Sequence, residues 1–198
     1  MKLLAAPIVF AALVGAQTVP SKPGLYAVFQ TSQGTIVARL YEKDTPVAVQ
    51  NFVALAQGTK PWKEPNTGAM VKRPLYDNLI FHRVLPGLAI QSGDPTGVGS
   101  HDCGIRIHDE FLPGLRFDTA GRLAVANTGA ADSGGCQFFI TTDAMQQWNG
   151  KYTIFGNVVS GQDVADKISK VKVRGDRPVD PVRLITVTIE RVGPAPKK

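Results

Sequence analysis

Residues 81–94 have the sequence FHRVLPGLAIQSGD, which reads as two short apolar strands joined by a Pro-Gly turn. Arg83 stands among apolar neighbours, where a charge is costly unless it is paired or has a task. If the two strands fold back on each other, Arg83 and Gln91 lie on the same face. The stretch therefore predicts a β-hairpin that presents an arginine and a glutamine side by side.

Two other stretches complement this hairpin. Residues 134–140 (GGCQFFI) supply apolar side chains, and residues 123–129 (LAVANTG) supply small ones. Successive residues of a strand point to opposite faces. We therefore expect Phe138 to enter the core and Phe139 to face the other way.

Composition favours one β-rich domain. The chain has 198 residues, 43% of them hydrophobic and 19% charged, which suits a single domain with a full core. Its 14 prolines and 20 glycines indicate many turns. The formal net charge is +6, but the lysines and arginines are scattered, so we predict no nucleic-acid binding. A basic surface-binding protein remains an alternative that rests on charge alone.

The N-terminus has the pattern of a secretory signal. Residues 3–14 form an apolar run too short to span a bilayer comfortably, and small residues follow up to Ala16. We expect a signal peptide over residues 1–16, cut after Ala16, and a mature protein that is periplasmic or secreted and free of the membrane. An uncleaved anchor or a buried helix is the open alternative.

The rest of the chain divides into a leader (17–23), a folded domain (24–192) and a flexible tail (193–198). An insertion-like polar loop is expected at 59–74. Apolar periodicity predicts a helix beginning at Pro46 and ending at Gly58, and a second over residues 163–169. Alternation predicts strands over 25–31, 35–41, 79–85, 88–91, 122–126, 137–141, 153–159 and 182–192.

Four blocks in this order resemble the cyclophilin family of peptidyl-prolyl cis-trans isomerases: residues 81–94, 121–129 (GRLAVANTG), 135–141 (GCQFFIT) and 150–168 (GKYTIFGNVVSGQDVADKI). A weaker block at 45–58 is similar to the family's first helix. The resemblance implies a mainly β fold, a closed eight-stranded antiparallel β-barrel capped by two α-helices, with its site on an outer face. It also implies catalysed rotation of X-Pro bonds in proline-containing polypeptides, by a monomer.

The resemblance assigns catalytic roles to Arg83, Gln91 and Phe139. Rotation breaks no bond, so we expect neither a nucleophile nor a metal or other cofactor. We expect instead a fixed guanidinium that favours the twisted amide. The substrate-binding residues implied are Phe81, His82, Leu88, Ala89, Ala126, Asn127, Gln137, Trp148 and Tyr152. Leu88 and Ala89 replace the family's usual aromatic residue and methionine, and Trp148 lies one place after the usual tryptophan position.

The chain has two cysteines, Cys103 and Cys136. In the family their segments line the same side-chain pocket, and an exported protein keeps disulfides. We therefore expect the two to pair, with two unpaired thiols as the alternative.

Other candidate sites are weaker. His101, Cys103 and His108 match no standard zinc spacing, and residues 93–99 lack the ending of a phosphate-binding loop. Residues 100–102 (Ser-His-Asp) are adjacent in sequence, whereas a triad is assembled in space. A peptide-binding holdase on the same scaffold, without catalysis, remains open.

Overall fold

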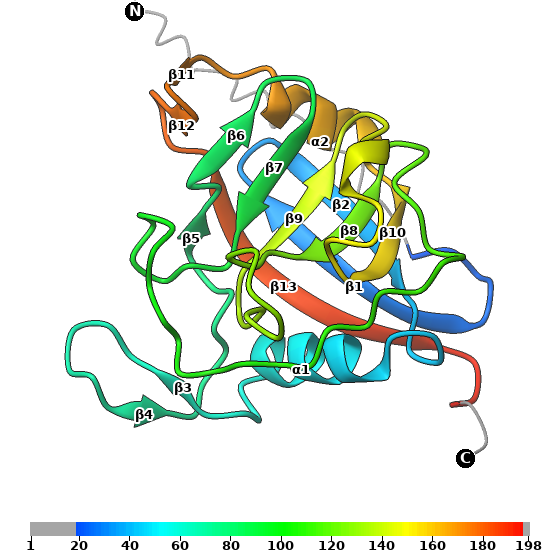
Figure 1. Ribbon diagram of the computed structural model, residues 1–198, viewed down its shortest axis with the longest axis horizontal. Coiled ribbons are helices and arrows are strands. Elements are labelled where there is room, and N and C mark those ends of the chain that lie inside the picture. The colour runs from blue at the N-terminus through cyan, green and yellow to red at the C-terminus, as the bar shows by residue number, and fades with distance from the viewer. Residues whose placement is uncertain (1–18, 196–198) are drawn as a thin grey trace, which may run out of the picture.

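The computed structural model describes residues 19–195 (Figure 1). The expected signal peptide at 1–16 lies outside the described residues, as do the start of the leader and the end of the tail. Within residues 19–195, no helix is long and apolar enough to cross a bilayer.

The described chain is mainly strand, with two α-helices and one 3₁₀ turn. In chain order the elements are β1 (Gly24–Thr31), β2 (Gly34–Leu40), α1 (Pro46–Ala56), β3 (Trp62–Lys63), β4 (Met70–Val71), β5 (Leu79–Ile80), β6 (Arg83–Leu85), β7 (Ala89–Ser92), β8 (Arg122–Val125), β9 (Phe138–Thr141), η1 (Gln146–Trp148), β10 (Ile154–Ser160), α2 (Gln162–Ser169), β11 (Val173–Arg174), β12 (Arg177–Pro178) and β13 (Arg183–Val192).

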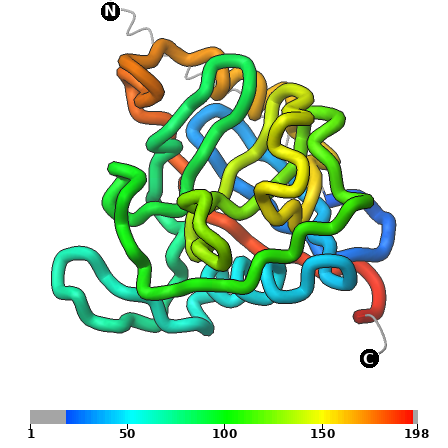
Figure 2. Tube along the Cα trace, in the orientation of Figure 1, coloured from blue at the N-terminus to red at the C-terminus, as the bar shows by residue number. Residues whose placement is uncertain are grey.

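One curled sheet of nine strands dominates the molecule, in the order β5-β13-β1-β2-β10-β8-β9-β7-β6. Every pair in it is antiparallel. Helix α1 lies at one end of the curl and α2 at the other (Figures 1 and 2). Two short hairpins, β3-β4 and β11-β12, stand apart from this sheet.

The prediction of a closed, eight-stranded barrel is wrong on both points. The segment expected as one strand over 79–85 is interrupted at Phe81 and His82, so it supplies two strands. Strand β5 pairs with β13 at one edge of the sheet, and β6 pairs with β7 at the other. The two edges are thus consecutive pieces of one segment, and because they pair with different strands and not with each other, the sheet stays open.

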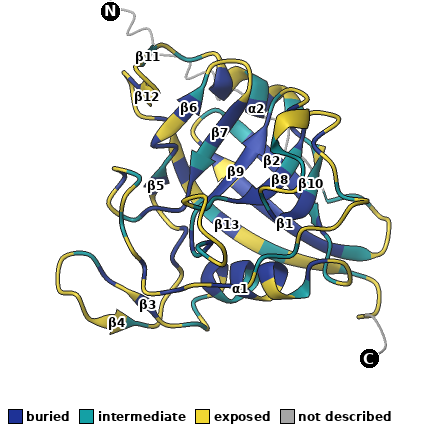
Figure 3. Ribbon diagram, in the orientation of Figure 1, coloured by how far each residue is buried: buried dark blue, intermediate teal, exposed yellow. Residues whose placement is uncertain are grey.

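The core lies inside the curl, where Figure 3 shows mostly buried ribbon. Phe52 projects from α1 into an aromatic cluster with Phe29, Tyr76, Phe138 and Phe155, at ring-centroid distances of 5.0–5.9 Å. The buried residues of α1 include Val49, Phe52 and Ala56, as the helical period requires. Phe138 lies in this core, as strand alternation predicts.

The segment at 59–74, expected as a polar loop, contains the β3-β4 hairpin. Trp62 is buried there, donates from its indole N–H to the Arg73 carbonyl at 2.9 Å, and lies under the Arg73 guanidinium. Two-residue strands are too short to show alternation in a sequence, which is why this hairpin and β11-β12 were not predicted.

Helix α1 begins without a side-chain cap from Thr45. Instead, the Glu110 carboxylate accepts hydrogen bonds from the backbone N–H groups of Val47 (3.1 Å) and Ala48 (3.0 Å). Free N–H groups and the helix dipole at an N-terminus both favour such an anion. The long loop before β8 is thereby tied to α1.

Candidate active site

Arg83 and Gln91 face each other across the β6-β7 hairpin. Arg83 Nη1 donates to Gln91 Oε1 at 3.4 Å. Gln91 Nε2 donates to Gln137 Oε1 at 2.9 Å, and Gln137 Nε2 donates to the Gly99 carbonyl at 3.0 Å. This chain of amides orients Gln91 and links the hairpin to β9 and to the loop after β7.

The other side of Arg83 meets an acid. Arg83 Nε donates to Asp176 Oδ2 at 2.8 Å, and both side chains are about half exposed. The guanidinium is therefore held on two sides while it remains open to solvent.

Phe139 projects from β9 on the opposite side from Phe138, into a second apolar cluster. Its ring meets Trp148 at 5.2 Å and Tyr152 at 5.1 Å, both edge to face. Phe117 stacks on Phe139 at 6.0 Å. Such contacts fix ring orientations, so the Phe139 ring is held in one orientation.

A small cavity of about 80 Å³ joins these two features. Its lining combines polar groups with aromatic rings. The residues around it are Arg83, Leu85, Ala89, Gln91, Ala126, Asn127, Phe139, Trp148 and Tyr152. The size suits one small apolar ring beside a cation, since pockets for drug-sized ligands run to about 300–1,000 Å³.

A larger cavity of about 300 Å³ adjoins the small one and shares Gln91, Ala126 and Asn127 with it. Cys103 and Cys136 line its wall and are joined by a disulfide with Cα atoms 6.4 Å apart. The bond leaves no Cys103 thiolate for the zinc site considered above.

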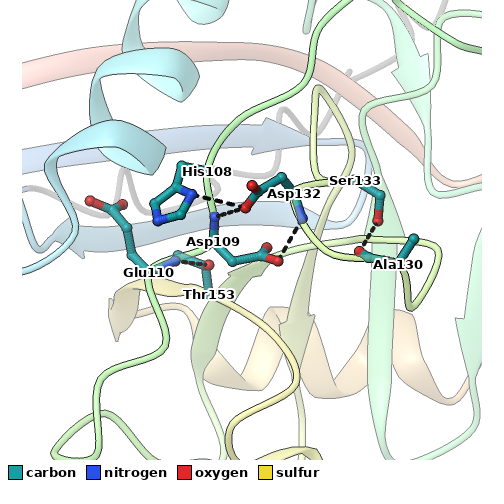
Figure 4. Close-up of polar contacts among 7 residues, drawn as sticks. All are labelled: His108, Asp109, Glu110, Ala130, Asp132, Ser133 and Thr153. Atoms are coloured by element: carbon teal, nitrogen blue, oxygen red, sulfur yellow. Dashed lines mark hydrogen bonds and ion pairs between the residues drawn. The ribbon is translucent and has the colours of Figure 1, made fainter.

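Polar contacts fix the turn that borders the larger cavity (Figure 4). Asp109 and Asp132 exchange backbone-to-carboxylate hydrogen bonds, both at 2.8 Å, and His108 Nδ1 meets Asp132 Oδ1 at 3.0 Å. Ser133 Oγ donates to the Ala130 carbonyl at 2.6 Å. The cavity rim is thus tied to the segment that carries Glu110.

Three residues predicted to bind substrate line neither cavity. Phe81 is fully buried in the core, because the strand break beside it cancels the alternation that would place it with Arg83. Leu88 lies on the exposed side of the Pro-Gly turn, before β7 begins. His82 is buried and packs against Gly99, so it supports the loop that lines the larger cavity.

The small cavity brings together eight of the residues predicted to bind or act: Arg83, Ala89, Gln91, Ala126, Asn127, Phe139, Trp148 and Tyr152. Ala126 and Asn127 line both cavities, and Gln137 lines the larger one. Asp176 and Phe117 were not predicted. Phe117 lies in a long loop without periodicity, and Asp176 lies in a turn where a charged residue has no distinguishing pattern.

Asp94 anchors the loop after β7. It is fully buried and accepts hydrogen bonds from the backbone N–H groups of Thr96 (2.7 Å), Gly99 (2.6 Å) and His101 (3.2 Å). Burial alone would raise the pKa of Asp94, but the hydrogen bonds outweigh it and lower the pKa. The carboxylate thereby holds the loop that forms one wall of the larger cavity.

His82 makes a pH dependence predictable. Burial lowers its pKa, and the charge of Asp94 and the Gln137 side chain offset this only in part. As pH falls through about 6.5, the unfolded chain therefore takes up this proton first, and folding stability is lost. Between pH 7 and 5, chemical denaturation should show a smaller fall in unfolding free energy for His82→Gln than for the wild type. His108→Gln, which alters an exposed ring, is the control; parallel curves for wild type and His82→Gln would contradict the prediction.

An arginine fixed beside a small aromatic pocket, on the outer face of a curled antiparallel sheet, defines a site for an apolar ring next to a polar backbone. Residues 26–189 match the family model for cyclophilin type peptidyl-prolyl cis-trans isomerases. The chain belongs to this family, and it is an isomerase.

Curated relatives carry the same activity in their names. Peptidyl-prolyl cis-trans isomerase A of Mycobacterium tuberculosis is 43% identical over 166 residues, which cover 82% of this chain and 91% of the relative. Isomerase B of Streptomyces anulatus is 41% identical over 170 residues, covering 84% and 97%. A Cryptosporidium parvum cyclophilin, solved in the presence of the dipeptide Ala-Pro, has a TM-score of 0.71 and 28% identity, covering 83% of this chain and 98% of its own.

Proposed function

We propose that this isomerase accelerates X-Pro rotation in flexible protein segments outside the cytoplasm, and so assists their folding as a monomer. The observation that carries the proposal is that Arg83, Gln91 and Phe139 line one cavity of about 80 Å³. The proline ring occupies the apolar side of this cavity, and its amide lies against the polar side.

The site has to lower the energy barrier to rotation about one peptide bond. Rotation about a peptide bond costs about 18–20 kcal/mol because resonance is lost. In the twisted state the proline nitrogen becomes pyramidal and gains a lone pair, which neither planar state offers. A donor aimed at that nitrogen stabilises only the twisted state, and this is what accelerates the reaction.

Arg83 is the donor in this proposal. Its Nε is engaged by Asp176 and its Nη1 by Gln91, while Nη2 has no partner among the described residues. Phe139 holds the ring so that the prolyl side stays fixed while the preceding residue turns. Trp148 and Tyr152 close the ring site from the side.

The larger cavity extends the site along the substrate. It shares Ala126 and Asn127 with the small cavity, so a peptide that enters one passes the other. The Asn127 side chain is already occupied, because it donates to the Lys151 carbonyl and accepts from the Gly129 N–H. Its backbone is the part we assign to strand-like pairing with substrate.

Export is the second part of the proposal. The apolar run at residues 3–14 and the small residues before Gln17 support a cleaved signal. The Cys103–Cys136 bond supports it independently, because disulfides persist in oxidising compartments.

Two measurements test the two parts. Catalytic amounts of the mature protein should speed the slow, proline-limited refolding phase of an unrelated protein, and Arg83→Ala should not. Full-length chain expressed in a bacterial host should yield a periplasmic or secreted product whose N-terminal residue is Gln17. A protein that slows refolding would support a holdase instead, and an intact Met1 in the cytoplasm would contradict export.

A further inference from the structure

The β11-β12 hairpin, residues 173–178, lies beside β6 at the edge of the curled sheet (Figure 1). Nothing in its sequence marks it as part of a site. Its turn carries Asp176, whose carboxylate accepts the Arg83 Nε hydrogen bond at 2.8 Å.

From this contact we infer that Asp176 is a positioning residue for the isomerase reaction, which fixes the plane of the Arg83 guanidinium. The inference rests on the proposed role of Arg83. Asp176 does not line the cavity, so in this inference it acts through Arg83.

Backbone features also hold Asp176 in place, independently of the contact that its side chain makes with Arg83. The Val84 N–H donates to the Asp176 carbonyl at 2.6 Å, and Val84 is fully buried. Gly175 adopts a φ of +66°, which an L side chain rarely takes, and so turns the hairpin tightly before the acid. These features place the Asp176 carboxylate next to β6, the strand that carries Arg83.

The site of the hydrogen bond on Arg83 determines its consequence. Nε belongs to the rigid plane of the guanidinium, so a partner there restricts rotation of the whole group. With Nη1 directed at Gln91, two bonds define the plane and leave Nη2 available to the cavity. Without Asp176, one bond of 3.4 Å remains, and the group rotates about it.

The Asp176 carboxylate has two effects on the reaction rate, with opposite signs. It orients the Arg83 guanidinium, which favours catalysis, and its negative charge offsets the positive charge of Arg83, which disfavours it. The side chains of Arg83 and Asp176 are 47% and 54% exposed, so water screens their attraction and the charge effect is small. Orientation is not screened. Removal of Asp176 should therefore slow the reaction rather than speed it.

A double-mutant cycle tests the inference. Asp176→Ala should lower kcat/KM for a proline peptide by about three- to tenfold, mainly in kcat, since the substrate-binding groups are untouched. In an Arg83→Ala background the same change should have less than about a twofold effect, because the residue it positions is gone. Asp180→Ala, an exposed acid nearby with no hydrogen bond to Arg83, should match the wild type. NMR exchange spectroscopy with high enzyme concentrations keeps the slow variants measurable.

The outcomes separate this inference from the proposed function. If Arg83→Ala retains wild-type turnover, the role of Arg83 fails and the inference fails with it. If Arg83→Ala is impaired but Asp176→Ala behaves like Asp180→Ala, only the inference on Asp176 is overturned. An equal loss from Asp176→Ala in both backgrounds would show a structural role for the hairpin and would also overturn it. Asp176→Asn, which keeps an acceptor of the same shape, should recover part of the lost kcat.

Discussion

Arg83→Ala is expected to lower kcat/KM for a proline-containing peptide by about tenfold to a thousandfold, the range for loss of one transition-state donor. Arg83 is the only cation among the residues that line the small cavity of the described chain. No neighbouring lysine or arginine of that cavity can replace its hydrogen bond to the twisted amide. A protease-coupled assay over a range of peptide concentrations measures the effect.

Two companion variants sharpen that result. Arg83→Lys should also be impaired, since an ammonium has neither the plane nor the Nε that Asp176 and Gln91 orient. Arg174→Ala removes an exposed arginine from the neighbouring hairpin and should leave turnover unchanged. Wild-type turnover in Arg83→Ala would contradict the assignment.

Removal of the disulfide is expected to have the largest effect on stability. The bond spans 33 residues, and the chain entropy restored to the unfolded state corresponds to about 3–4 kcal/mol. The Cys103→Ser, Cys136→Ser variant should lose about this much unfolding free energy in chemical denaturation. Because both residues line the larger cavity, the kcat/KM of this variant should also fall for peptides that reach beyond the proline ring.

Reductant supplies the control for the disulfide. It should destabilise the wild type towards the level of the serine variant and leave that variant unaffected. Thiol labelling of denatured, non-reduced wild type should find no free thiol. Two reactive thiols, or equal stabilities with and without reductant, would contradict the bond.

The parts of the fold that were predictable are those with a clear local period. Helix α1 follows from the spacing of Val49, Phe52 and Ala56. The β6-β7 hairpin follows from its Pro-Gly turn. Strand alternation separates Phe138 from Phe139, and with them the core from the outer cluster.

The predictions that were wrong or missing concern features set by contacts between residues far apart in the sequence or in the sheet. Residues 79–85 are apolar enough for one strand, yet their two halves pair with opposite edges of the sheet, and only the whole curl shows this. The same break sends Phe81 to the core rather than to the site. Phe117 and Asp176 lie 22 and 93 residues from the partners they contact, Phe139 and Arg83, so no local motif can identify them.

The central claim is that the Arg83 cavity catalyses rotation rather than merely binding peptide. Exchange spectroscopy on a proline peptide in large molar excess over the enzyme tests it most directly. The account predicts cis–trans exchange cross-peaks on the subsecond timescale with wild type, against tens to hundreds of seconds unaided, and their strong weakening with Arg83→Ala. Chemical-shift changes that show peptide bound in the cavity, without any faster exchange, would contradict the account.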